Sequence, residues 1–169
     1  CIDPKSRAHI LAGTYPIEED IRREMDAFVA VFEKYGIKVC RPKNIKGLNQ
    51  IFTRDIGFVI DNKFVKSNIL PDRENEIEAI QYVIDLIDPE NVIRPPEEVH
   101  IEGGDVMLCG DHLFVGTYRG EDYADFIIAR TNVEAIDWIK KTFPQKKVVS
   151  FNLRKDNDDP YSNALHLDC

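Results

Sequence analysis

Three short polar segments hold the residues of this sequence that are best suited to acid–base chemistry. They are Phe52-Thr53-Arg54-Asp55, Glu102-Gly103-Gly104-Asp105 and His166-Leu167-Asp168. An imidazole close to a carboxylate can act in general acid–base catalysis. Several converging carboxylates attract a cation, which can be a metal ion or a planar guanidinium held by paired hydrogen bonds. Together the segments indicate a cation-binding site with an acid–base pair.

Taken singly, each segment also has a structural interpretation. An Asp before a strand, such as Asp55 or Asp105, often hydrogen-bonds to its own backbone. The Gly pair that follows Glu102 can permit a tight turn, and a lone His is more often a packing residue than a catalyst. The combination of acids at matched positions with an acid–imidazole pair is what favours a functional site.

An internal repeat places two of these segments at equivalent positions. Four residues recur 50 positions later, so that Asp55, Asp61, Phe64 and Val65 correspond to Asp105, Asp111, Phe114 and Val115. Each copy is typical of a hairpin followed by a helix and a further strand, a ββαβ unit. We expect Asp55 and Asp105 to face the common axis of a ring of such units. The sequence has no glycine-rich phosphate loop, which argues against a dinucleotide site.

Hydrophobic spacing predicts the elements that hold these segments. Helices are expected over residues 17–35, 72–87 and 133–143, the last capped by Thr131 or Asn132. Strands are expected over residues 8–12, 37–40, 58–60, 63–65, 92–93, 106–109, 112–115, 147–153 and 164–168, with a polar loop over 156–163. In a final strand, His166 and Asp168 would share one face and Cys169 would point to the other.

Composition and charge exclude several classes of partner. With 22 Lys and Arg against 30 Asp and Glu, the net charge of −8 disfavours binding to nucleic acid or to an anionic membrane. No apolar run approaches the roughly 20 residues of a membrane span, and the polar N-terminus does not resemble a signal peptide. The four cysteines lack zinc-site spacing, so we expect reduced thiols in a cytoplasmic protein.

The three segments, together with Arg130-Thr131-Asn132, resemble in type and order the guanidino-group-modifying enzymes of the pentein superfamily. These are arginine deiminases, dimethylarginine dimethylaminohydrolases and glycine amidinotransferases, and the resemblance runs over about residues 8–169. It implies an α/β fold, a pseudo-fivefold α/β propeller of ββαβ units. At about 50 residues per unit, three of the five units fit in this length. We therefore expect one pentein-like domain over residues 1–169 that lacks C-terminal units and whose open strand edges favour a homo-oligomer.

The resemblance also implies roles for individual residues. Asp55 and Asp168 would bind the substrate guanidinium, and Glu102 would orient His166 as general acid and base. Arg73 or Arg130 would meet a substrate carboxylate. Both arginines also have a structural interpretation, near a helix start and a helix cap respectively. The remaining polar candidates are interpreted as structural: Asp105 as a turn residue, and His9, His100 and His112 as residues without a motif.

The chemistry that the resemblance implies is covalent and requires neither cofactor nor metal. A cysteine thiolate attacks the guanidinium carbon, an amine leaves, and water or another amine resolves the intermediate. No cysteine of this sequence matches that nucleophile. Cys40 and Cys109 fall at strand positions typical of buried thiols, Cys169 is expected to face away from Asp168, and Cys1 has no counterpart. We therefore expect a chain whose nucleophile is not identifiable, with truncation as the leading explanation.

The predicted function is a C–N hydrolase of arginine or an arginine derivative, similar to a deiminase or dimethylaminohydrolase. An amidinotransferase that passes the amidino group to an acceptor amine is the alternative within the family. A non-catalytic pentein that serves in binding or assembly is the alternative of another class. An unrelated α/β domain would instead bind a divalent ion among Asp55, Glu102 and Asp168.

Overall fold

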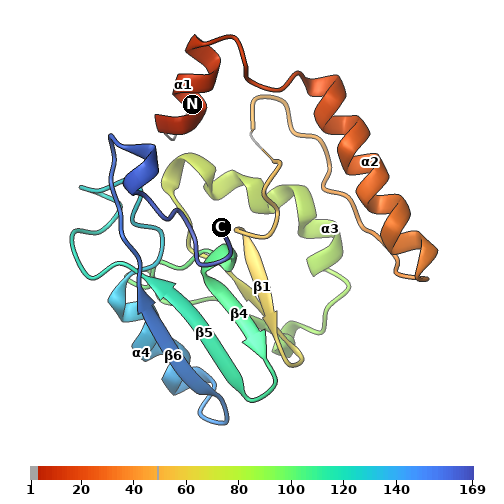
Figure 1. Cartoon of the computed structure of the whole chain (residues 1–169). Helices are drawn as coiled ribbons and strands as arrows, with labels where there is room; N and C mark the ends of the chain where they lie inside the picture. The colour runs from red at the N-terminus through yellow and green to blue at the C-terminus, as the bar shows by residue number, and fades with distance from the viewer. Residues whose placement is uncertain (1–3, 49) are drawn as a thin grey trace. The chain divides into compact units, whose positions relative to one another are not determined.

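The computed structural model describes residues 4–48 and 50–169, which belong to two compact units, Cys1–Arg41 and Pro42–Cys169 (Figure 1). The first unit contains helices α1 (Pro4–Leu11) and α2 (Glu18–Lys34). Three acids, Glu18, Glu19 and Asp20, lie in the first turn of α2, where they stabilise its positive dipole end. The expectation of one pentein-like domain over residues 1–169 stays a prediction.

Two strands predicted in the first unit are absent. Residues 8–11, predicted as part of a strand, lie in α1, and residues 37–40 form no strand. The helix begins at Pro4, a residue type that is common at the first position of a helix, and it ends before Gly13, which has a φ of 67°. Alanine and leucine within the run are strong helix formers, so local propensity outweighed the apolar run that had indicated a strand.

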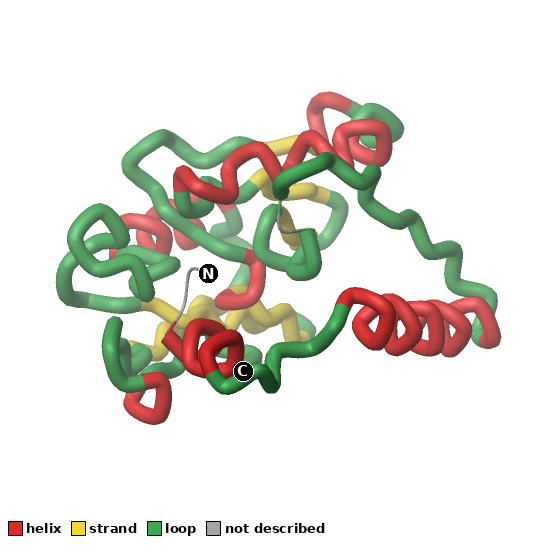
Figure 2. The backbone as a smooth tube through the Cα atoms, turned by 90° about the horizontal axis from the view of Figure 1, so that it is seen from above, coloured by secondary structure: helices red, strands yellow, loops and turns green. Residues whose placement is uncertain are grey.

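The second unit is built from two ββαβ repeats, as the sequence predicted. The first sheet contains β1 (Gly57–Ile60), β2 (Lys63–Lys66) and β3 (Val92–Ile93), and the second contains β4 (Val106–Cys109), β5 (His112–Thr117) and β6 (Lys147–Asn152). In each sheet an antiparallel hairpin is followed by a third strand parallel to the second. The two sheets are separate in the view from above (Figure 2).

The repeat aligns at the acids but not at the hairpin turns. The Asp55 N–H donates to the Phe52 carbonyl at 3.1 Å, and the Asp105 N–H donates to the Glu102 carbonyl at 3.0 Å, so each acid closes a turn before its strand. At the hairpin tips the left-handed residues are Asp61 and Gly110, with φ of 54° and 59°. These are 49 positions apart, so the predicted equivalence of Asp61 with Asp111 is one residue off.

The helical connections of the two repeats differ. In the second repeat, helix α4 (Val133–Thr142) begins at Asn132, whose side chain accepts a hydrogen bond from the Ala135 N–H, as predicted. In the first repeat, a 3₁₀ helix, η1 (Pro71–Ile80), precedes one turn of α-helix, α3 (Gln81–Ile84). Its buried side chains are Arg73, Glu76 and Ala79, and this spacing of three matches the three residues per turn of a 3₁₀ helix.

One core serves both repeats. Its buried members come from both sheets, the segment between them and α4: Ile60, Val65, Val99, Ile101, Leu113, Val115, Ala135, Ile136, Ile139 and Phe143. Tying both repeats to one core holds the turns before β1 and β4 in a constant relation, and these turns carry Asp55 and Asp105. None of the helices described here has the length and apolar character that crossing a membrane would need.

The predicted strand over residues 164–168 is wrong. These residues form an irregular segment and a turn, and the polar loop before them contains a short 3₁₀ helix, η4 (Pro160–Ser162). The Asp168 N–H donates to the Gly104 carbonyl at 3.3 Å, so the segment packs on the turn before β4 and not along a strand. Cys169 is therefore not directed away from Asp168 as strand alternation would require.

Candidate active site

Two buried carboxylates, those of Asp55 and Glu76, surround the guanidinium of Arg73. Asp55 is 1% exposed, and its Oδ2 accepts a hydrogen bond from Arg73 Nη1 at 2.9 Å. The Glu76 carboxylate accepts hydrogen bonds from Nε and Nη2 of the same guanidinium, both at 2.9 Å. Burial alone would lower the pKa of Arg73, but hydrogen bonding to Glu76 and the charge of Glu102 outweigh it and raise that pKa. Arg73 is thus a permanently charged, enclosed cation.

Glu102 and His166, which the family resemblance pairs, lie in contact in the structure. Glu102 Oε2 lies 2.8 Å from His166 Nε2, and both side chains are almost fully buried. Arg130 Nη1 donates to both Glu102 oxygens, at 3.2 and 3.1 Å. Burial would raise the pKa of Glu102, but the hydrogen bond from His166 and the charge of Arg130 outweigh it and lower that pKa. Glu102 is therefore an ionised acceptor.

The ionised Glu102 determines which nitrogen of His166 is available for chemistry. A carboxylate can only accept, so Nε2 carries a proton and donates to Glu102. The other nitrogen, Nδ1, is buried without a hydrogen-bond partner, and it lies 4.0 Å from Asp55 Oδ1. Nδ1 is therefore the ring nitrogen that makes no hydrogen bond within the described residues, and it lies beside a carboxylate.

Close approach of backbone segments explains the two glycines after Glu102. A Cβ on Gly104 would lie 2.9 Å from Cγ of His166 and 3.0 Å from Asp55 Oδ1, and one on Gly103 would lie 1.9 Å from the Arg54 carbonyl oxygen. A side chain at Gly103 would require the backbone at Arg54 to move, and one at Gly104 would require the His166 ring or the Asp55 carboxylate to shift. The Gly pair thus lets the turn before β4 fit between the residues that bear the acids and the imidazole.

Asp105 holds the segment that carries His166. Its Oδ2 accepts from the Thr131 hydroxyl at 2.7 Å, and its Oδ1 accepts from the Leu167 N–H at 3.0 Å. Burial raises the pKa of Asp105. Asp105 therefore joins the segment before α4, through Thr131, to the turn that contains His166 and Asp168, through Leu167. This is a structural role.

Arg54 bridges the two acids that were predicted to bind a substrate guanidinium. Its Nη1 is hydrogen-bonded to Asp168 Oδ2, and its Nε lies 3.3 Å from Asp55 Oδ1. Its Nη2 donates to Cys169 Sγ at 3.8 Å. The Arg54 side chain is 43% exposed and Asp168 is 25% exposed, so this part of the site opens to solvent. Asp55 and Asp168 are thus spaced to hold one guanidinium between them.

Comparison with known proteins identifies the fold. No family model matches the chain. Dimethylarginine dimethylaminohydrolase from Pseudomonas aeruginosa, solved with citrulline, superposes with a TM-score of 0.70 at 18% identity over 85% of this chain and 54% of its own. The N-terminal domain of ArgZ, an arginine dihydrolase from cyanobacteria, gives 0.61 at 21% identity over 82% and 46%. Both are pentein superfamily members. The chain has the pentein fold.

Two further proteins extend this comparison. SxtG, an amidinotransferase from Microseira wollei, matches with a TM-score of 0.62 and 16% identity over 84% of this chain and 52% of its own. The uncharacterized protein YkgA of Bacillus subtilis (strain 168) is 33% identical over 122 residues, which are 71% of this chain and 36% of YkgA. The chain thus spans about half the length of the pentein structures that it matches. The predicted resemblance is confirmed at the level of the fold.

Within this pentein unit, the predicted site residues come together but differ in access. Asp55, Glu102, His166 and Asp168 form one contiguous cluster, as the contacts above establish. Arg73 and Arg130 contact the same cluster from the inside, where they are 4% and 3% exposed. Both guanidiniums are enclosed by protein carboxylates, so neither is presented to solvent in this structure.

Lys155 is a part of the site that the sequence did not reveal. Its Nζ donates to the carbonyls of Ala164 and Leu165, at 2.8 and 2.6 Å, immediately before His166. Burial lowers the pKa of Lys155 to about 8, although Asp105 partly opposes this. The residue lies in a polar loop after β6, where no motif or periodicity marks it. It clamps the backbone that presents the imidazole.

Among residues 4–48 and 50–169, two groups of side chains have the donor atoms of a metal site. In the first, Asp55, Glu102 and His166, the donor atoms lie within 4.8 Å of one another. Arg73 Nη1 lies 2.9 Å from Asp55 Oδ2 and 3.5 Å from Glu102 Oε2. The second group, His166, Asp168 and Cys169, meets the same distance limit, and Arg54 is bonded to two of its members. In both groups an arginine supplies the positive charge.

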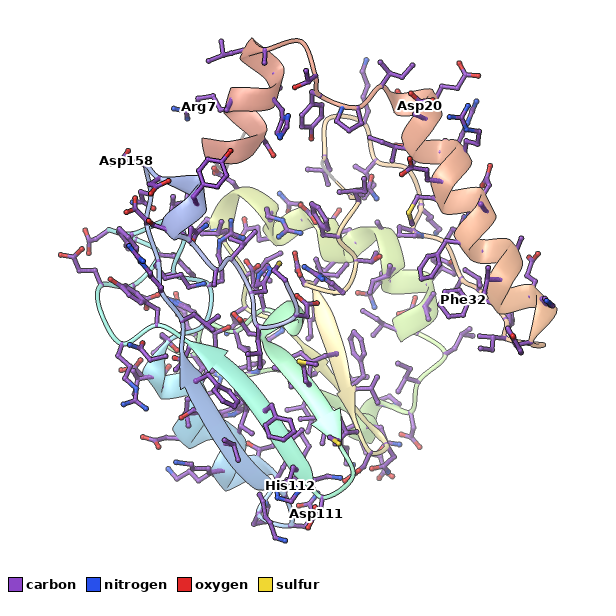
Figure 3. The ribbon with its side chains drawn as sticks, in the orientation of Figure 1. Arg7, Asp20, Phe32, Asp111, His112 and Asp158 are labelled. Carbon is purple, nitrogen blue, oxygen red and sulfur yellow. The ribbon has the colours of Figure 1, made fainter. Side chains whose placement is uncertain are left out.

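The thiols are placed differently from the prediction. Cys40 and Cys109, expected to be buried, are both exposed. Cys109 pairs with His112 at the tip of the β4–β5 hairpin, where Figure 3 labels His112 and Asp111. Cys169, also exposed, lies beside Asp168, with Sγ 3.8 Å from its Oδ1. A turn replaces the predicted strand, which brings this thiol to the site.

The other histidines have local partners. His100 Nδ1 lies 2.7 Å from Asp122 Oδ2 and its ring stacks on Tyr123. His112 Nδ1 lies 2.5 Å from Asp111 Oδ1, and His9 Nδ1 lies 2.9 Å from the Thr14 hydroxyl. These contacts are those expected of structural residues.

Proposed function

We propose that the protein acts on the guanidinium group of arginine or an arginine derivative, as a C–N hydrolase similar to a deiminase or dimethylaminohydrolase. The observation that carries this proposal is the bridge that Arg54 makes between Asp55 and Asp168. Two acids that already hold one guanidinium have the spacing and charge to hold another in its place. The pentein fold, shared with a dimethylaminohydrolase and an arginine dihydrolase, supports the same class of substrate.

In the proposed mechanism, the substrate guanidinium replaces Arg54 between Asp55 and Asp168. A thiolate attacks the central carbon, and the C–N bond to the leaving amine breaks. His166 supplies the proton that the amine needs and then removes one from the water that cleaves the amidino thioether. Glu102 fixes the tautomer of His166 through Nε2. No cofactor or metal takes part in these steps.

We assign the nucleophile to none of the described cysteines. Cys109 lies at the hairpin tip, and the Cys169 sulfur is held between Arg54 and Asp168. The proposed contact of Arg73 or Arg130 with a substrate carboxylate would require either guanidinium to leave the acids that enclose it. In their present positions we infer that the charges of Arg130 and Arg73 help to keep Glu102 ionised, so that it can accept from His166.

An assay of guanidino consumption tests the proposal. Arginine and dimethylarginine are each incubated with the full protein, and citrulline is measured. We expect His166→Ala to abolish turnover with the fold intact by circular dichroism, while His112→Ala, at the hairpin tip, leaves turnover unchanged. Equal loss in both variants, or citrulline production by His166→Ala at the native rate, would contradict the assignment. Consumption of no guanidino compound would favour a non-catalytic pentein that serves in binding or assembly.

An amidinotransferase is the second candidate, because the chain also matches SxtG, an amidinotransferase. The same assay run with and without glycine or ornithine separates the two reactions. Citrulline formed without an acceptor supports hydrolysis, and a new guanidino compound formed only with the acceptor supports transfer. A cytoplasmic location and a homo-oligomeric state remain part of the proposal.

A further inference from the structure

A pocket of about 580 Å³ lies at the end of the first sheet, and none of Asp55, Glu102, His166 and Asp168 lines it. Its walls come from the ends of β2 and β3, the start of η1 and a later loop. The lining side chains used below are Lys66, Ser67, Glu74, Arg94, Glu97 and Tyr123. The volume falls within the roughly 300–1,000 Å³ that is typical of small-molecule sites.

The wall of this pocket is held by hydrogen bonds rather than left as a loose loop. Asn68 Nδ2 donates to the carbonyls of Pro95, Pro96 and Val99, at 3.3, 2.7 and 3.1 Å. The Ser67 N–H donates to the Ile56 carbonyl at 3.2 Å. Because Asn68 joins the chain after β2 to the chain after β3, the two edges of the pocket keep a constant separation.

Two cations lie side by side on one edge. The parallel register pairs Phe64 with Val92 and Val65 with Ile93, so the next positions, Lys66 and Arg94, are neighbours on one face. Within the part of the chain that the structure describes, neither side chain has an ion-pair or hydrogen-bond partner. Burial and the charge of Arg94 lower the pKa of Lys66, and the charge of Glu78 partly opposes this shift.

Two carboxylates line the same pocket without neutralising those cations. Among the described residues, Glu74 and Glu97 form no salt bridge and accept no side-chain hydrogen bond. Burial raises the pKa of Tyr123, which lines the same pocket, and the charges of Asp122, Glu102, Glu74 and Glu97 add to that rise. Opposite charges therefore line one pocket, and among the described residues no ion pair joins them.

We propose that this pocket binds a small zwitterion of the α-amino acid type. Its carboxylate would lie against Lys66 and Arg94, and its ammonium would lie toward Glu74 and Glu97. A simple anion would leave the two carboxylates unmatched, and a simple cation would leave Lys66 and Arg94 unmatched. This inference goes beyond the proposed reaction and does not depend on it.

Calorimetric titration at constant ionic strength tests the proposal with three probes. These are glycine as the smallest zwitterion, acetate as the anion alone and methylammonium as the cation alone. We expect glycine to bind about tenfold or more tightly than either single-charge probe, because it satisfies both edges at once. Acetate binding as tightly as glycine, or no binding of glycine, would overturn the proposal.

Variants locate the binding site. Arg94→Gln and Glu97→Gln are each expected to weaken glycine binding about tenfold, since each removes one charge–charge contact. Both residues are exposed, so the fold is retained, which thermal unfolding verifies. Arg119→Gln and Glu134→Gln serve as matched controls outside the pocket and should bind glycine as the native protein does. Loss of binding in Asp168→Asn with retention in Arg94→Gln would place glycine in the active site and refute the proposal.

Discussion

Substitution of Arg54 tests whether Asp55 and Asp168 form a guanidinium site. Arg54 occupies the position that we propose for the substrate, so a substrate must displace it to bind. Replacing it by Gln (Arg54→Gln) keeps much of the side-chain volume and removes the competing charge. We therefore expect KM for the guanidino substrate to fall, with little change in kcat.

The size of this effect follows from the exposure of the pair. Arg54 is 43% and Asp168 25% exposed. Ion pairs that solvent reaches are worth about 0.2–1 kcal/mol. A competitor of that strength weakens substrate binding by about twofold to sixfold, and the additional contact to buried Asp55 favours the upper part of this range.

Steady-state kinetics with arginine as substrate measures the change, and the chain offers a matched control. Arg23 forms an exposed ion pair with Asp20 in α2, at 2.8 Å, and Arg23→Gln should leave KM unaltered. An increase in KM for Arg54→Gln would refute the reasoning, because it would mean that Arg54 helps to bind the substrate rather than competing with it. A KM unchanged in both variants would show that the acids are not the substrate site.

Three further predictions concern the framework of the site. Gly104→Ala should destabilise the protein by about 1–3 kcal/mol in urea unfolding and reduce turnover, because the added Cβ meets the His166 ring at 2.9 Å; native stability would contradict the packing described. Thr131→Val should cost about 1–3 kcal/mol, since it leaves buried Asp105 short of a donor, while Thr131→Ser should restore most of the loss. For Lys155, the folded pKa of about 8 lies below the ordinary 10.5, so the folded protein binds fewer protons than the unfolded chain between these values. The stability of the native protein relative to Lys155→Met should therefore rise with pH across that interval, and a fall would contradict the burial of a charged amine.

Local chemistry explains which elements were predictable. The hairpins were predicted correctly because their tips carry turn residues, Asp61-Asn62 and Gly110-Asp111, between β-branched or aromatic runs. Helix α4 was predicted because Asn132 is a strong cap ahead of an amphipathic stretch. The 3₁₀ helix was not, because its form depends on Arg73 and Glu76 being buried together, which apolar periodicity does not record.

The site, too, has features that the sequence predicted and features that it did not. Residue types and the order of the motifs were enough to select Asp55, Glu102, His166 and Asp168 as candidates. Acid–base chemistry requires carboxylate and imidazole side chains, and these residue types can be recognised in the sequence. The sequence could not predict which of these side chains solvent or a substrate can reach. Arg73 and Arg130 have the type expected of a substrate ligand, yet their partners come from distant segments and enclose them.

The amino-acid sequence alone therefore determined the ββαβ repeat, the chemical character of the cluster and its likeness to the penteins, because these depend on side-chain type and on patterns within a few residues. Only the tertiary structure decided that Arg54 bridges the two acids, that Lys155 clamps the backbone before His166 and that Cys169 turns toward Asp168. Each of these contacts joins residues whose partners depend on the path of the whole chain, and hydrogen-bonding groups brought together by folding leave no local signal.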